Sequence, residues 1–130
     1  MAAEGDGTIH VTVGDVTHVV RPDRPAVFGR GAEIDLGNDR RLHRSQGRLD
    51  RHGGTWWLSN TGRSAPLHLV DESLGSITVV PPGCQAPVCS PACLVWLRHG
   101  ETHFELQLTQ PGVLVPPEPT PAPVSGATTR

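Results

Sequence analysis

Lysine is absent from this chain of 130 residues, and so are long apolar runs and an apolar leader segment. No stretch approaches the ~18 apolar residues that a membrane-spanning helix needs. The first seven residues are acidic and lack the apolar core of a secretory signal. We therefore expect no membrane association and a cytoplasmic location. The basic side chains are all arginine, a bias that reflects genome composition more than chemistry.

Catalytic motifs are also missing. The seven histidines are scattered, without the i, i+4 helical pairing of a metalloprotease, and no Gly-x-Ser-x-Gly elbow or phosphate-cradling Gly/Lys loop occurs. Asp35 and Asp39 lie four residues apart, but no partner acid or base completes a catalytic pair. We predict a binding protein that uses no cofactor and is not an enzyme.

The charge of the chain is unevenly distributed. Between Arg40 and Arg63 there are six arginines and one acid, Asp50, so this segment carries +5 while the rest of the chain carries −7. A cationic centre in an anionic chain favours a local anionic partner such as a phosphate, whereas nucleic-acid binding usually needs a broader basic surface. The alternative is that these arginines only solvate strand ends.

Short alternating runs separated by Gly and Pro predict an all-β fold. Strands are expected over 8–13, 16–21, 26–30, 47–50, 55–59, 67–70, 76–80, 93–98 and 102–108. Short strands spaced by about ten residues are typical of a β-sandwich or barrel. Trp57 and Trp96 are expected in the core, with Trp56 on the opposite face of its strand. From residue 111 the chain is rich in proline, which removes ladder donors, so we predict a domain over 6–110 and a flexible tail or linker over 111–130.

Three cysteines, Cys84, Cys89 and Cys93, are followed by His99 and His103. This set raises the alternative of a zinc site, but the C-x4-C-x3-C spacing lacks the C-x2-C knuckle and the strand that follows would bury Cys93. A Cys84–Cys89 disulfide is a further alternative, which a cytoplasmic location disfavours. We predict no metal.

A series of motifs resembles the forkhead-associated (FHA) family, in particular a divergent bacterial, actinobacterial-like member. The motifs are Phe28-Gly29-Arg30, Asp35-Leu36, the block from Leu42 to Leu49, Trp57-Leu-Ser-Asn60, Thr61-Gly62-Arg63-Ser64 and Val80-Pro-Pro-Gly83. The resemblance implies a β-sandwich of about eleven short strands whose loops at one end recognise phosphothreonine peptides. In physical terms, Gly29 permits a tight turn, and Arg30 at the sheet end can hold a phosphate with two charge-assisted bonds.

The resemblance assigns a site residue by residue. Gly29 and Arg30 match the family's pair and Arg44 its arginine, whereas His43, Gln46 and Ala65-Pro66 replace its serine, histidine and Asn-Gly. The expected phosphopeptide-binding residues are Arg30, His43, Arg44, Ser45, Arg63 and Ser64, supported by the motif residues Gly29, Gln46, Asn60 and Gly62. His43 would donate best when protonated, near or below about pH 6.5.

Two functions follow from this reading. The first is recognition of a phosphorylated protein or peptide, in signalling by a Ser/Thr kinase. The second is a degenerate module that acts as a phosphate-independent scaffold or oligomerisation surface. The arginines favour the first, and the replaced serine and asparagine positions favour the second.

Overall fold

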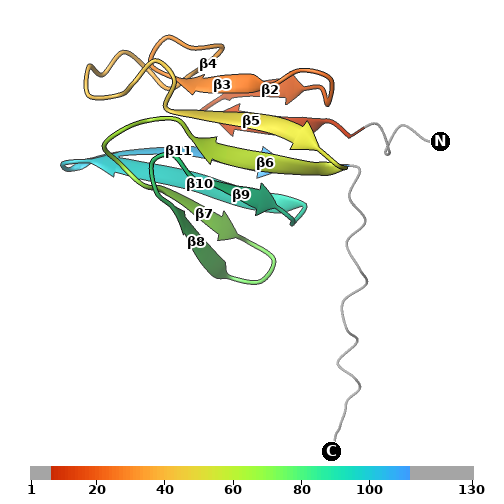
Figure 1. Cartoon of the computed structure of the whole chain (residues 1–130). Coiled ribbons are helices and arrows are strands. Elements are labelled where there is room, and N and C mark those ends of the chain that lie inside the picture. Colours follow the sequence, from red (N-terminus) through yellow and green to blue (C-terminus); the bar gives the residue numbers. More distant parts are fainter. Residues whose placement is uncertain (1–6, 112–130) are drawn as a thin grey trace, which may run out of the picture.

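A computed structural model describes residues 7–111, which form two β-sheets (Figure 1). The described part contains eleven strands: β1 (Ile9–Val13), β2 (Val16–Val20), β3 (Ala26–Gly29), β4 (Ile34–Asp35), β5 (Gly47–His52), β6 (Thr55–Asn60), β7 (Leu67–Asp71), β8 (Ser76–Val80), β9 (Gln85–Val88), β10 (Ala92–His99) and β11 (Thr102–Thr109). The predicted all-β sandwich of about eleven strands is confirmed. Residue 6, the predicted start of the domain, lies outside the described residues. So does the predicted tail, apart from Pro111. Nothing in residues 7–111 forms a helix long and apolar enough to cross a bilayer.

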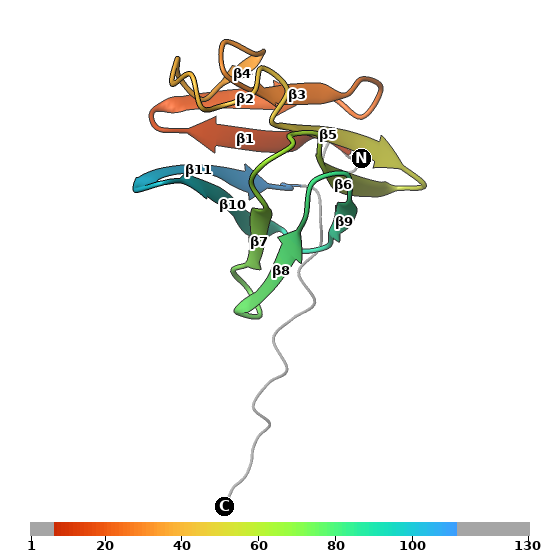
Figure 2. The ribbon, with the colours of Figure 1, turned by 60° about the vertical axis from the view of Figure 1, so that its left-hand side comes forward.

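The sheets have the strand orders β2-β1-β11-β10-β7-β8 and β4-β3-β5-β6-β9. The pairing between β3 and β4 is parallel, and the other pairings are antiparallel. Figures 1 and 2 show that the β3–β4 turn and the loop from β4 to β5 lie at one end of the molecule, away from the β7–β8 hairpin. The five-stranded sheet thus holds both loops at one end of the molecule, which we call the rim.

Alternate side chains of both sheets form the core, as the pleat of a strand requires. Its largest fully buried members are Trp56, Phe28, Ile9, Ile34, Leu42, Leu49, Leu58, Leu67, Leu97, Leu106 and Leu108. The prediction that Trp57 lies in the core and Trp56 on the opposite face is wrong. Trp56 points inward with Leu58, and Trp57 is only half-buried. The Trp56 indole N–H donates to the Gly7 carbonyl (2.8 Å), which satisfies its polar atom. Trp96 is half-buried as well, and its ring stacks on His68 with the centroids 3.8 Å apart.

The sequence prediction missed two strands, β4 and β9. Strand β4 has two residues, and β9 contains Pro87, which suggested a loop. Proline is tolerated here because β9 is the edge strand of its sheet. Residues 85–88 are therefore a strand and not part of a loop.

Strand β9 also separates Cys84 from Cys89. Five extended steps place their Cα atoms ~16 Å apart, beyond the ~7 Å limit for a disulfide, and both thiols are free and exposed. Cys93 is buried in β10, and burial raises the pKa of its thiol to about 11. Within residues 7–111 no three His, Cys, Asp or Glu side chains are grouped as metal ligands.

Candidate functional site

The end of β3 places Arg30 against the loop that precedes β5. Its backbone N–H donates to the carbonyl of His43 (3.0 Å), and its Nε donates to the carbonyl of Leu42 (3.1 Å). The amide of Leu36 donates to the carbonyl of Gly29 (2.9 Å), which closes the β3–β4 turn. Arg30 is thus fixed at its backbone and at Nε, which leaves its Nη groups as the remaining guanidinium donors.

Gly29 allows this close approach. A Cβ atom at position 29 would overlap the backbone carbonyl groups of His43 and Arg44. Because both obstacles are backbone atoms, a larger residue would have to push the whole 43–44 segment away. Glycine at this position therefore sets the distance between the β3 end and the loop.

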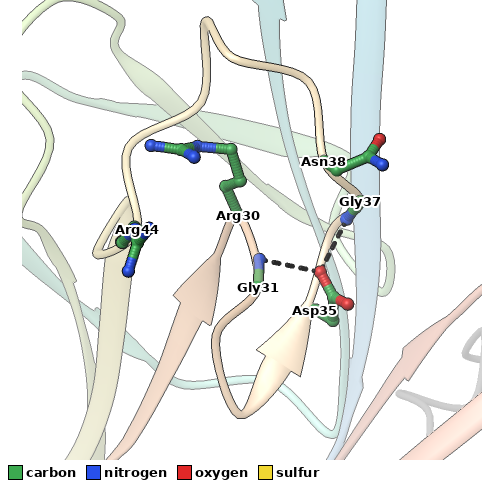
Figure 3. Close-up of a pocket in the computed structure, with 6 residues that line it drawn as sticks. All are labelled: Arg30, Gly31, Asp35, Gly37, Asn38 and Arg44. Atoms are coloured by element: carbon green, nitrogen blue, oxygen red, sulfur yellow. Dashed lines mark hydrogen bonds between the residues drawn. The ribbon is translucent and has the colours of Figure 1, made fainter.

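Arg30 and Arg44 line a shared hollow of about 560 Å³ with Gly31, Asp35, Gly37 and Asn38 (Figure 3). Figure 3 shows the Arg30 side chain directed toward Arg44 and away from Asp35. Neither arginine forms an ion pair within residues 7–111. The hollow therefore presents two guanidinium groups that form no ion pair in the described chain, although the carboxylate of Asp35 also lines it.

The carboxylate in this hollow belongs to Asp35 and binds backbone amides. One oxygen, Oδ1, accepts from Gly37 and from Gly31, each at 2.9 Å. These amides, Gly37 first and Gly31 second, lower the pKa of Asp35. Its charge holds the β3–β4 turn and the start of the next loop together.

Gln46 links the loop before β5 to β3 and to the β6–β7 loop. It is fully buried; its backbone N–H donates to Phe28 (2.9 Å), its side-chain Oε1 accepts from the His43 amide (3.0 Å), and its carbonyl accepts from Gly62 (3.2 Å). Its Nε2 has no partner in residues 7–111, and a Cβ at Gly62 would overlap it. Residue 46 thus connects β3 and the β6–β7 loop through its main chain, while the glutamine side chain braces the 43–46 segment.

Asn60 shapes the β6–β7 loop from inside the protein. Its side-chain Nδ2 donates to the carbonyls of Ala65 (2.9 Å) and Val80 (2.8 Å), while its Oδ1 accepts from the Gly62 amide (3.1 Å). The residue is 1% exposed. All three of these bonds are shielded from water and fix the path of residues 60–65.

The remaining predicted site residues do not line the hollow. Ser45 contacts the neighbouring loop, since its Oγ is 2.7 Å from Thr61 Oγ1. The Nε2 atom of His43 is buried and has no partner within the described chain, while Arg63 and Ser64 are exposed in the β6–β7 loop. The structure therefore brings Arg30 and Arg44 together and leaves the other four residues outside the lining of the hollow.

The cationic segment of the sequence is not one patch. Arg41 binds Asp39 (2.8 Å), Arg48 lies 3.7 Å from Asp50, and Arg51 donates to the Gly54 carbonyl (3.1 Å). Sequence reasoning also missed Gly31, Asp35, Gly37 and Asn38 as lining residues. The Asp-Leu-Gly step at 35–37 is a turn signal that indicates this role, because an Asp side chain often binds the amide two residues on.

Comparisons with known proteins agree on the fold. No family model matches the sequence, and neither does any curated protein. Among solved structures, the FHA-1 domain of Mycobacterium tuberculosis Rv1747 is 16% identical with a TM-score of 0.60, over 78% of this chain and 94% of that one. The FHA domain of human APLF, in complex with an XRCC1 bisphospho peptide, is 17% identical with a TM-score of 0.61, over 78% and 97%.

A third structure, the FHA domain of an Arabidopsis thaliana hypothetical protein, is 15% identical with a TM-score of 0.63, over 89% of this chain and 94% of that one. These likenesses extend over nearly the whole of each solved domain. The resemblance noted in the sequence motifs is thereby confirmed for the architecture. The chain has the fold of a forkhead-associated domain.

Proposed function

We propose that this chain is a phosphopeptide-binding interaction module whose ligand is a phosphothreonine made by a Ser/Thr kinase. The observation that carries the proposal is the pairing of Arg30 and Arg44 around one hollow, with neither bound to a carboxylate of residues 7–111. Guanidinium groups bind phosphate through charge-assisted, often bidentate, hydrogen bonds. The similar APLF domain in complex with a bisphospho peptide supports the same ligand class. The partner is then a phosphorylated cytoplasmic protein, bound without a chemical reaction.

Arg30 is the central phosphate ligand in this proposal. Its backbone and Nε bonds orient the guanidinium before the ligand arrives, so little side-chain freedom is lost on binding. Arg44 supplies the second cation. Asp35 opposes a phosphate by its charge, but its Oδ1 is bound to two amides, and two cations outweigh one anion.

The four predicted residues that do not line the hollow have secondary roles. Because Nε2 of His43 is buried, only Nδ1 of that ring is left for the ligand, and the His43 carbonyl acts by holding Arg30. Arg63 and Ser64 are exposed on the adjoining loop and contact peptide residues beyond the phosphate. Ser45 is exposed and also contacts peptide residues beyond the phosphate, while its hydroxyl keeps the hydrogen bond to Thr61.

A phosphate-independent scaffold is the second candidate function. It is favoured by position 65, where buried Ala65 offers no side-chain donor, and by Pro66, which has no amide hydrogen. The loss of a peptide-gripping asparagine costs about 1–3 kcal/mol of affinity when nothing replaces it. A binding surface elsewhere on the domain would then carry the interaction.

Paired peptide libraries distinguish the two functions. The full chain is titrated with phosphothreonine and threonine versions of one library, alongside Arg30→Ala and a matched control, Arg98→Ala, which removes an exposed arginine outside the hollow. Phosphate-dependent binding that Arg30→Ala abolishes and Arg98→Ala leaves intact supports the proposal. Equal binding of both libraries, unchanged by Arg30→Ala, supports the scaffold. Thermal unfolding of each variant checks that it is folded.

A further inference from the structure

Strand β8 ends the six-stranded sheet and has β7 as its only strand neighbour in that sheet. Figures 1 and 2 show it at the outer side of the β7–β8 hairpin, away from the rim that carries the hollow. The free side of an edge strand presents backbone N–H and C=O groups that another strand can pair with. Proteins usually block such edges with charges, prolines or very short strands.

The other three sheet edges of the described chain have a charge beside or within the strand, a proline within it or a very short strand, whereas β8 has none of these and is followed by Pro81 and Pro82. Strand β4 has two residues and β9 contains Pro87. Strand β2 carries His18 and is flanked by Asp15 and Arg21. Strand β8 has neither charge nor proline, and no charged residue occurs anywhere in 73–83.

The outer face of β8 is also apolar. Ile77 and Val79 are 60% and 54% exposed, and the strand register sets them beside Val70 and His68 of β7. On the other side of β7, Leu94 of β10 pairs with Val70 and Trp96 of β10 pairs with His68. We call the set Ile77, Val79, Val70, Leu94 and Trp96 the apolar stripe. It continues to the free edge, so a strand added there would extend it.

We propose that β8 pairs antiparallel with β8 of a second copy of this chain, around a two-fold axis at Thr78. With this axis, side chains that face each other across the two copies lie on the same face of the joined sheet. Thr78 of one copy then lies opposite Thr78 of the other, Ile77 opposite Val79 and Ser76 opposite Val80. Opposed β-branched apolar side chains stabilise a strand pair. Electrostatics favour a second copy as the occupant, because two uncharged edges meet without repulsion and neither offers a charge to attract a charged peptide.

This pairing is independent of the phosphopeptide proposal. No residue of β8 lines the hollow between Arg30 and Arg44. The β3–β4 turn and the β4–β5 loop, which carry the lining residues, lie away from the β7–β8 hairpin (Figures 1 and 2). The dimer would therefore leave two hollows open. Loss of phosphate binding and loss of dimerisation can be measured separately, the first with Arg30→Ala and the second with changes at Thr78.

Charge exchange at the two-fold axis tests the pairing. Sedimentation equilibrium of the full chain is expected to show a concentration-dependent dimer, which Thr78→Lys and Thr78→Glu each weaken at least tenfold because like charges then oppose each other. An equimolar mixture of these two variants should restore the dimer, because opposite charges now meet. Val19→Lys is the matched control, since Val19 is 59% exposed on the other edge strand, β2.

Three outcomes overturn the proposal. The first is a wild-type chain that stays monomeric at every concentration, which would leave the edge free for a strand of another protein. The second is a dimer that Val19→Lys breaks and the Thr78 variants do not. The third is failure of the mixed variants to associate although each is folded by thermal unfolding.

Discussion

The backbone N–H of Arg30 donates a 3.0 Å hydrogen bond to the carbonyl oxygen of His43. This bond joins the end of β3 to the loop before β5, so the two arginines of the hollow, Arg30 and Arg44, lie on segments that are held directly to each other. Their spacing therefore depends on backbone contacts more than on flexible side chains.

Replacement of Gly29 by alanine should disturb both stability and binding. The added Cβ meets the carbonyl groups of His43 and Arg44, so the loop must shift, at a cost of about 1–3 kcal/mol of unfolding free energy. Because the same shift moves Arg44, phosphopeptide affinity should fall as well. Urea denaturation and peptide titration measure the two effects.

Gly53→Ala provides the comparison. Gly53 has a φ of +60° but nothing within 4 Å of the added Cβ, so this change should lower stability through backbone strain alone. Peptide affinity should stay at the wild-type value. Equal affinity losses in the two variants would mean that the Gly29 contact does not position the site.

Asn60→Asp should destabilise the domain although it is nearly isosteric. A carboxylate still accepts from the Gly62 amide, but it would face the carbonyl oxygens of Ala65 and Val80, where the amide N–H groups now donate. We expect a loss of at least about 2 kcal/mol near neutral pH. Chemical denaturation checks this, with Asn38→Asp, an exposed asparagine, as the control.

At low pH the domain should lose the stabilisation that the surface carboxylate of Asp39 provides. The side-chain hydrogen bond from Arg41 is the main cause that lowers the pKa of Asp39 from 3.8 to about 2, and Arg41 also donates to the His99 carbonyl (3.0 Å). A lowered folded-state pKa means that the contribution is complete above 3.8 and is lost as the pH falls through about 2.

Denaturation of wild type and Asp39→Asn across this range measures the effect. The stability difference between them should be constant from neutral pH down to about 4 and should shrink toward zero near pH 2. A difference that stays the same at pH 2 would mean that the carboxylate charge contributes nothing.

The three cysteines should differ in the reactivity of their thiols. Cys84 and Cys89 are exposed, whereas Cys93 is buried with a thiol pKa of about 11. A thiol reagent at neutral pH should therefore modify two thiols quickly in the native protein and the third only on unfolding. Mass spectrometry identifies the sites. Rapid native labelling of Cys93 would contradict its burial in β10.

Sequence periodicity predicted most of the fold for a physical reason. Runs such as Thr55–Asn60 alternate because one face of each strand packs on the core, and Gly or Pro marks where each run stops. Periodicity did not decide which tryptophan faces inward, because Trp56 and Trp57 are adjacent and equally apolar. Strand β9 was hidden by Pro87, whose tolerance depends on an edge position that only the tertiary structure defines.

The candidate site was predictable only in part. Family resemblance named Arg30 and Arg44, which the structure places together. It could not show that the Ser45 hydroxyl contacts Thr61, or that Gln46 links three segments, because both depend on contacts between loops that are distant in sequence. Local residue types give no signal for such pairings.

A double-mutant cycle between Arg30 and the phosphate tests the central claim most directly. Isothermal titration gives the binding free energies of wild type and Arg30→Ala with one selected peptide in its phosphothreonine and threonine forms. If the Arg30 guanidinium binds the phosphate, the coupling energy should be at least about 1.5 kcal/mol. A coupling within about 0.3 kcal/mol of zero, with both proteins folded, would contradict the account.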